Sequence, residues 1–183
     1  NNIYRIYADG FLEYEYIPGI GTSEKGDITK AFANSLAFLS RIGRVLTTQA
    51  DIYLSGIAET HNSYRFTFDY KIQDYPIQID YIGKGKYNEA VTNAIVIEAN
   101  SQRIIRGYGV LKNIEFSKEA AYYNVNMGDL MNNFELDLSE QYINDMTVAY
   151  VIKTDEEKNL KPVWLIEIKD AESITVPLHE KGE

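Results

Sequence analysis

Strict alternation of apolar and polar residues marks the clearest segment of the chain. Across residues 64–72 the apolar positions are Tyr64, Phe66, Phe68, Tyr70 and Ile72. Nine residues with a period of two predict an antiparallel strand with one solvated side. The Tyr75-Pro76 step then predicts a turn, and the alternation resumes over residues 77–81, so the whole segment predicts a hairpin.

The hydrophobic period changes to that of a helix at residue 28. The positions that share one helical face are Ile28, Ala31, Phe32, Ser35, Leu36, Leu39 and Ile42. Asp27, Ser23 or Thr22 can cap the start, and Gly43 can close the end. The spacing therefore predicts one amphipathic helix over residues 28–43 whose apolar stripe covers a sheet.

The order of elements suggests that the chain contains a duplication. Two strands around an Asp9-Gly10 turn precede the helix, and a strand and the hairpin follow it. The same order begins again near residue 94. The predicted elements there are strands at 95–99 and 104–110, a short helix with Met127, Leu130, Met131 and Phe134 on one face, strands at 146–152 and 163–168, and a last strand at 174–178.

We therefore predict an α+β protein made of two similar halves, each an antiparallel sheet covered by one helix. The first half spans residues 1–82 and the second spans residues 94–183. Residues 83–93 are polar and contain glycine, which is typical of either a linker between halves or a long hairpin loop.

Composition and charge narrow the classes of function. Of the 183 residues, 45% are hydrophobic and 25% are charged, as in folded soluble proteins. A net charge of -9 argues against DNA, RNA or anionic lipid as the main partner, because phosphate binding requires clustered Lys and Arg. The chain has no cysteine, which excludes disulfides, thiolate metal sites and a cysteine nucleophile. The absence of cysteine is compatible with an exported protein.

The sequence shows no run of ~18 apolar residues that could span a membrane, and no signal peptide. Because Ile3 and Tyr4 already belong to a predicted strand, we expect these residues to come from a longer protein. Tyrosine is unusually frequent, with 15 Tyr against 7 Phe and 1 Trp. Both packing on half-buried sheet surfaces and a protein-interaction surface would explain this excess.

Candidate residues for chemistry are few and isolated. His61 and His179 lie in polar segments outside any metal-binding or triad motif, so we interpret both as surface histidines. Gly83-Lys84-Gly85-Lys86 lacks the spacing of a phosphate-binding loop, and Gly107-Tyr108-Gly109 lacks the third glycine of a dinucleotide fingerprint. The latter segment is expected to allow a β-bulge, and Trp164 is expected to lie in a strand core.

Carboxylates are numerous but alternate along strands, which predicts that they face solvent. The candidates are Glu13, Glu15, Asp69, Asp80, Glu98, Glu115, Glu135 and Asp137. A pair of carboxylates of the glycosidase type cannot be located from their spacing, and the acidic run Asp155-Glu156-Glu157 is typical of a solvated hairpin end. The sequence therefore assigns no catalytic, cofactor-binding or metal-ligating residue.

Two parts of the chain resemble known bacterial regulators. The segments YADGFLEYEY and YLSGIAETHNSYRFTFDYKIQDYPIQIDY resemble the YycH regulatory proteins of Gram-positive bacteria. The segments AIVIEANSQRIIRGYGVL and MTVAYVIKTDEEKNLKPVWLIEI resemble the related YycI proteins. Tyr75-Pro76 and Pro162-Val163-Trp164 are the best matches to the short motifs of these families. The chain differs from them in having no N-terminal membrane helix.

The resemblance implies an extracytoplasmic accessory protein of a two-component system, anchored to the cell membrane by a segment before residue 1. Such proteins contact a membrane sensor histidine kinase and a paralogous regulator, and they act without catalytic residues or cofactors. The same strands also resemble PepSY-like modules, which implies an inhibitory or ligand-binding module as the alternative. A carboxylate-dependent hydrolase is the third hypothesis.

Overall fold

A computed structural model describes residues 2–18, 24–43, 48–115, 117, 121–128, 130, 142–153 and 160–180. The chain divides into two compact units. The first comprises residues 1–116 with 152–156, and the second comprises residues 117–151 with 157–183.

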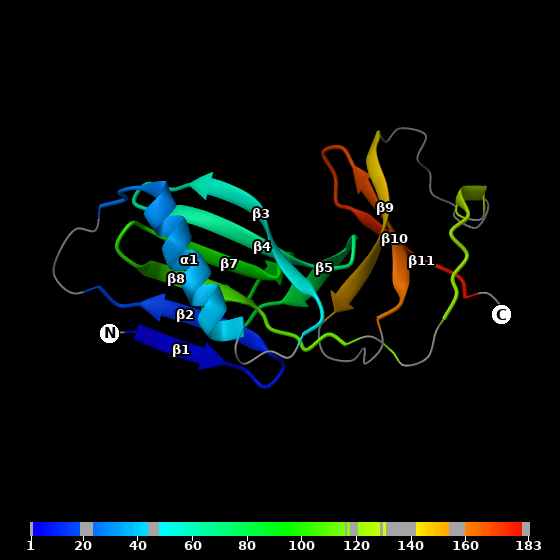
Figure 1. The fold of residues 1–183 in the computed structure, drawn as a ribbon. Helices are drawn as coiled ribbons and strands as arrows, with labels where there is room; N and C mark the ends of the chain where they lie inside the picture. Colours follow the sequence, from blue (N-terminus) through cyan, green and yellow to red (C-terminus); the bar gives the residue numbers. More distant parts are fainter. Residues whose placement is uncertain are drawn as a thin grey trace. The chain divides into compact units, whose positions relative to one another are not determined.

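The first unit is built on a single antiparallel sheet (Figure 1). Its strands lie in the order β1 (Asn2–Ile6), β2 (Phe11–Tyr16), β8 (Ile104–Val110), β7 (Ile95–Ala99), β4 (Tyr64–Ile72) and β3 (Asp51–Glu59). Within the described residues, β1 pairs with β2 and β3 pairs with β4, so these two strands form the edges of this arrangement.

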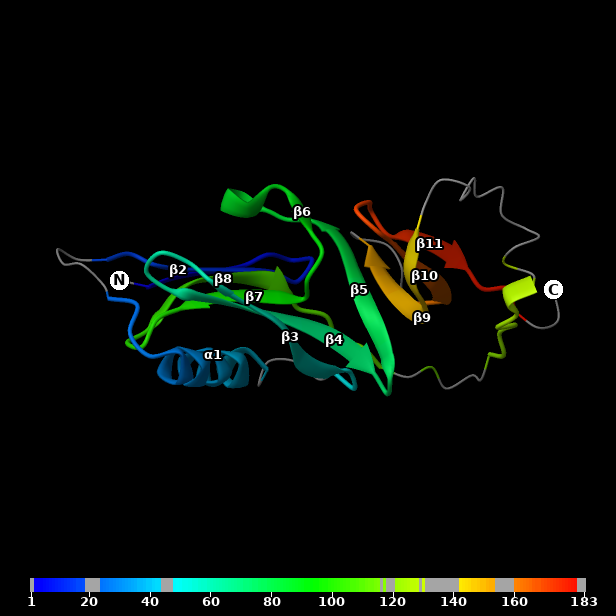
Figure 2. The ribbon, with the colours of Figure 1, turned by 90° about the horizontal axis from the view of Figure 1, so that it is seen from above.

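β4 is followed by a hairpin that pairs with its C-terminal end and then turns away from the sheet. β5 (Tyr75–Ile82) pairs with β4 from Tyr75 to Ile77, and its other end pairs with the short strand β6 (Ala90–Val91). The connection contains the 3-10 turn η1 (Gly85–Tyr87). Figure 2 shows η1 and β6 on the side of the sheet opposite the helix. Residues 83–93 therefore form a hairpin loop, one of the two arrangements expected for them.

The helix α1 (Ile28–Gly43) begins and ends at the predicted residues. Asp27 caps it, because its Oδ1 accepts hydrogen bonds from the backbone N–H groups of Thr29 at 2.7 Å and Lys30 at 3.1 Å. These two bonds hold the pKa of Asp27 below its usual value. The alternative caps at residues 22 and 23 lie outside the described part of the chain.

The buried face of α1 is rotated from the predicted stripe. The helix buries Ala31, Ser35, Phe38 and Ile42. Phe38 is 3% exposed although the predicted stripe omits it, whereas Leu36 is 45% exposed although the stripe includes it. The helix has more apolar surface than the sheet covers, so the sequence period alone could not show which part lies inward.

Aromatic contacts fix α1 on the sheet. The ring centroid of Phe38 lies 5.1 Å from that of Tyr14 on β2, and Phe32 lies 5.4 Å from Phe66 on β4. Gly107 on β8 lies beneath Phe38, since a Cβ there would be in van der Waals contact with the ring at 3.5 Å. One flank of α1 therefore lies over β2 and β8, and the other lies over β4.

The alternation of β4 is confirmed, because its five apolar side chains are all buried beneath the helix side of the sheet. Tyr70 is completely buried, and its hydroxyl donates to the carbonyl of Val110 at 3.1 Å. Burial raises the pKa of Tyr70 to about 12. The phenol therefore stays neutral, as an inward position requires.

β3 contains a bulge that changes which way its side chains face. Leu54 pairs with Phe68, and the next pair joins Gly56 to Thr67, so Ser55 is the extra residue. Ile57 then pairs with Phe66 and lies on the helix side, like Leu54. Without the bulge, Ile57 would lie on the opposite face.

The second unit contains three antiparallel strands, β9 (Ile143–Lys153), β10 (Pro162–Ile168) and β11 (Ile174–Pro177). β10 lies between the other two strands and pairs with both. Leu130 packs on it in a cluster with Ile166, Ile168 and Val176. Residues 127, 128 and 130 are helical, whereas positions 131–134 of the predicted short helix lie outside the described residues.

The prediction of two similar halves, each covered by a helix, is wrong. β7 and β8, which were expected to open the second half, are hydrogen-bonded between β2 and β4 of the first unit. α1 is the one α-helix that has defined bounds among the described residues. The local pattern shows that residues 95–110 form strands, but pairing between strands far apart in sequence leaves no local signal. Along the sequence, the first unit extends past residues 83–93 to residue 116.

Candidate interaction surface

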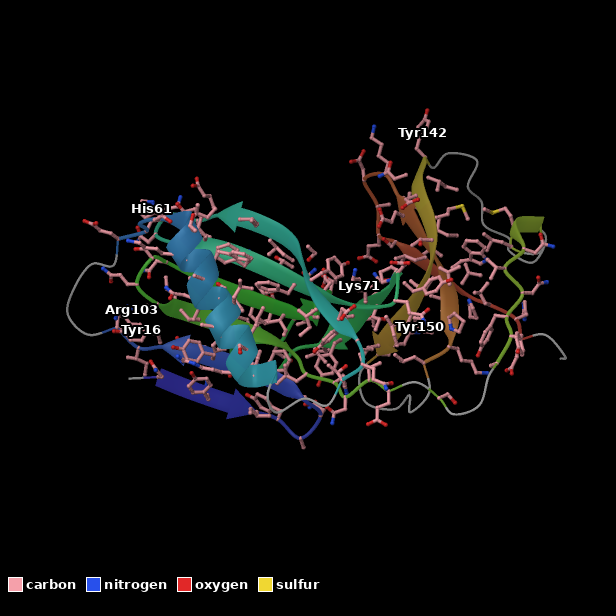
Figure 3. The ribbon with its side chains drawn as sticks, viewed as in Figure 1. Tyr16, His61, Lys71, Arg103, Tyr142 and Tyr150 are labelled. Atoms are coloured by element: carbon pink, nitrogen blue, oxygen red, sulfur yellow. The ribbon has the colours of Figure 1, made fainter. Side chains whose placement is uncertain are left out.

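The two histidines lie in different units and away from other candidate groups. His61 is exposed in the turn after β3 (Figure 3). His179 is also exposed, and its carbonyl accepts a hydrogen bond from the N–H of Asn124 at 2.9 Å. Among the residues that the structure describes, no group of three or more His, Asp or Glu side chains could hold a metal ion.

The lysines of the 83–89 loop anchor it to the β1–β2 hairpin. Lys84 forms an ion pair with Asp9, and the Nζ of Lys86 lies 2.5 Å from the Oε2 of Glu15. Burial opposes ionisation of Asp9, but the hydrogen bonds from Lys84, Tyr81 and the Phe11 N–H together with the charge of Lys84 outweigh it and lower the pKa of Asp9 to about 2. These lysines therefore act as structural ion pairs in the folded chain.

The same loop buries Glu13, which was expected to face solvent. Glu13 is 1% exposed, its Oε2 lies 3.0 Å from a guanidinium nitrogen of Arg5, and the Tyr7 hydroxyl lies 3.5 Å from that oxygen. Gly85 covers this cluster, since a Cβ at this position would lie 2.7 Å from the same carboxylate oxygen. The alternation of residues in β2 does not predict that a loop from another part of the sequence covers the strand.

Glu98 on β7 is held by Arg106 of β8 and by Ser63 of the turn before β4. The Nε of Arg106 lies 2.5 Å from its Oε2, and the Ser63 hydroxyl donates to Oε1. Burial opposes ionisation, but these hydrogen bonds from Ser63 and Arg106 prevail and lower the pKa of Glu98. Asp69 is held in a similar way, accepting a hydrogen bond from the N–H of Ala94 at 3.0 Å.

The remaining sequence candidates do not gather at one place. Asp80 and Glu115 are exposed, and Glu135, Asp137 and residues 155–157 lie outside the described part of the chain. The described carboxylates with a resolved pKa shift, Asp9, Asp27 and Glu98, all have a lowered pKa. Each of these three carboxyls is therefore ionised near neutral pH and accepts hydrogen bonds or pairs with a basic side chain at its own place in the fold.

Two further expectations concern glycine and tryptophan. The expected bulge at Gly107-Tyr108-Gly109 is wrong, because these residues pair regularly with β2 and β7. Gly109 instead allows a close approach, since a Cβ there would lie 2.4 Å from the carbonyl oxygen of Ala94. Trp164 is partly buried and packs against the apolar cluster of the second unit.

Tyrosines lie both in the core and on the surface, so packing on the sheet is observed and a protein-interaction surface stays a prediction. In the first unit Tyr14, Tyr70 and Tyr81 are buried in the core. Tyr16 lies at the edge of the unit, where the Arg103 guanidinium carbon is 4.6 Å from its ring centroid (Figure 3). In the second unit Tyr142 is 78% exposed.

An apolar surface runs beside the helix at the β3 edge of the first unit. We call it the β3–α1 strip and define it by Ile28, Leu36, Leu54 and Ile57. Their exposed fractions are 42%, 45%, 36% and 53% in that order. Four large aliphatic side chains exposed on α1 and on the edge strand β3 are typical of surfaces that another molecule covers.

Two contacts in the core link the β3 part of the strip to the α1 part. Ile57 pairs with Phe66, and Phe66 packs against Phe32 of α1. Ile28 and Leu36 flank Phe32 one helical turn away on either side, so they lie on the same flank of the helix. Sequence reasoning missed this surface, because it placed Ile28 and Leu36 on the buried face of the helix.

The chain gives no match to family models, to curated proteins or to solved structures. The resemblance to YycH and YycI regulators therefore stays a prediction. Among the helices described, none combines the length and apolar character needed to cross a bilayer.

Proposed function

We propose that this chain is a non-enzymatic regulatory domain that binds another protein through the β3–α1 strip. The observation that carries the proposal is an edge strand with exposed Leu54 and Ile57 beside a helix flank with exposed Leu36. Exposed aliphatic residues on an edge strand promote aggregation unless a partner covers them, so their presence favours a binding surface.

The resemblance suggests which partner to test. YycH and YycI regulators contact a membrane sensor histidine kinase and each other outside the cytoplasm, so we propose an extracytoplasmic, membrane-anchored regulator with such a partner. The PepSY-like inhibitory module would use the same strip against a different protein. The hydrolase hypothesis has less support, because the resolved carboxylate pKa shifts are downward.

The test is calorimetric titration of the full chain with the extracytoplasmic domains of the sensor kinase and of the paralogous regulator from the same genome. Ile57→Asp places a charge in the strip, and we expect it to weaken binding by about 30-fold or more, the effect of losing ~2 kcal/mol at a central contact. Ile6→Asp is the matched control, since Ile6 is a 65% exposed isoleucine on the opposite edge strand. Equal effects of both variants, or no binding by the unmodified chain, would contradict the proposal.

A further inference from the structure

We infer that the partner binds as an extended segment that adds to the free edge of β3 as an antiparallel strand. The segment has apolar residues at alternate positions and a basic residue at each end. This inference rests on the proposed function, because it specifies the chemistry of the partner at the same strip.

The backbone of β3 is suited to strand addition. Its nine residues pair with β4 along one edge, and in the part of the chain that the structure describes no strand pairs with the other edge. Alternate N–H and C=O groups of an edge strand point away from its neighbour. An added strand would satisfy these groups, and its alternate side chains would provide specificity.

The bulge at Ser55 sets the pattern of side chains that the added strand needs. It places Ile52, Leu54 and Ile57 together on the helix side. An added strand would follow the register of β4, whose residues opposite these three are Tyr70, Phe68 and Phe66. Three apolar residues at alternate positions would then lie beside the exposed side chains of the strip.

The charges of β3 define the ends of the partner segment. Asp51 and Glu59 stand at its two ends, and the strand has no Lys, Arg or His. Glu59 is 69% exposed even though Lys25 lies 2.8 Å from it. Opposite charges across a strand pair are stabilising, so basic residues opposite Asp51 and Glu59 are favoured.

The same charges argue against a second copy of this chain as the occupant. If two β3 strands paired antiparallel about Ser55, Asp51 of each copy would lie opposite Glu59 of the other. Like charges directly opposite each other destabilise a strand pair, and each copy also carries a net charge of -9. A cationic segment has neither problem.

The probe is the peptide Lys-Thr-Val-Thr-Val-Thr-Val-Lys, which places Lys opposite Asp51 and Glu59 and Val opposite Ile52, Leu54 and Ile57. It is titrated into the full 183-residue chain labelled with nitrogen-15, and amide chemical shifts are followed by NMR. We expect saturable shifts in residues 51–59 and on the flank of α1 that carries Leu36. Shifts confined to other strands, or no saturable shift, would overturn the inference.

Two control peptides distinguish strand addition from nonspecific hydrophobic binding. With Glu in place of both Lys residues, binding should weaken about tenfold or more, since two favourable charge pairs become repulsive. With N-methyl groups on alternate residues facing β3, binding should be lost because the donors are gone. Equal binding by either control would overturn the inference.

The outcome for the peptide is separable from the outcome for the proposed function. If Ile57→Asp abolishes binding of a partner protein but the Lys-ended peptide does not shift residues 51–59, strand addition is wrong. The strip would then still be a binding surface. If the calorimetric titration detects no partner protein, the proposed function itself fails.

Discussion

Gly85 holds the 83–89 loop against the β1–β2 hairpin. Its φ of +66° is a conformation that side chains other than glycine rarely adopt, and it lies directly over Tyr7 and Glu13. The ion pairs of Lys84 and Lys86 and the stacking of Tyr87 on Tyr108 at 4.1 Å complete the attachment. One glycine therefore allows a distant loop to bury a carboxylate on β2.

Replacing this glycine should destabilise the first unit. Gly85→Ala would place a Cβ 2.6 Å from the Tyr7 hydroxyl and require a strained φ, which we expect to cost about 1–3 kcal/mol in the free energy of unfolding. Urea denaturation monitored by circular dichroism measures the loss. Gly43→Ala is the control, because a Cβ there meets no atom within 4 Å. Equal stabilities of the two variants would contradict the described packing of the loop.

The acid stability of the protein should depend on Asp9 and Glu98. Both carboxyls have a lower pKa in the folded chain than their ordinary values of 3.8 and 4.5, and that of Asp9 is about 2. Each therefore binds fewer protons when folded, so its stabilising effect is present above the ordinary pKa and is lost as the pH falls through the folded pKa.

We expect the urea midpoint to fall as the pH is lowered from about 5 towards 2. Glu98→Gln should reduce the part of this fall that begins just below pH 4.5, because the amide has no proton to gain. The exposed Glu115→Gln variant is the control and should follow the unmodified chain. The assignment to Glu98 is wrong if its variant shows the same pH dependence as the control.

At the scale of elements, sequence patterns predicted whether a segment is a helix or a strand better than they predicted which of its faces is buried. The bounds of α1 and the alternation of β4 follow from local periodicity and an Asp cap, which are properties of short segments. The rotation of α1 and the bulge at Ser55 depend on which strand lies beneath or beside them. The β3–α1 strip arises from both, which is why the sequence did not reveal it.

Paired substitutions on α1 test its orientation. Phe38→Ala should cost about 3–5 kcal/mol because the ring is 3% exposed and packs against Tyr14 of β2. Leu36→Ala, two residues earlier, should cost less than about 1 kcal/mol because Leu36 is 45% exposed. Denaturant titrations of both variants measure the difference. A larger cost for Leu36→Ala would mean that the stripe predicted from sequence is the buried one.

At the scale of the whole molecule, the division into units follows from strand pairing over long sequence separations. β2 pairs with β8, and β4 pairs with β7, although about 90 and 30 residues separate the paired segments. The sequence therefore predicted that strands exist at 95–110 but assigned them to the wrong half. No residue type near position 116 marks the boundary between the units.

Fragments of the chain should reflect this division. A fragment of residues 1–116 keeps the strands from β1 to β8 and the pairs among them, and we expect it to unfold cooperatively on heating. A fragment of residues 1–93 lacks β7 and β8, which exposes β2 and β4, and should not fold. Circular dichroism melts and NMR shift dispersion compare the two. A folded 1–93 fragment would instead support the boundary predicted from sequence.

Amide hydrogen exchange of the full chain, alone and mixed with the proposed kinase or regulator partner, tests the central claim most directly. Outward amides of an unpaired edge strand exchange readily, and a bound strand protects them. We predict that the partner slows exchange in residues 51–59 and leaves the opposite edge strand, residues 2–6, unchanged. Protection that spares residues 51–59 would contradict a regulatory domain that binds through the β3–α1 strip.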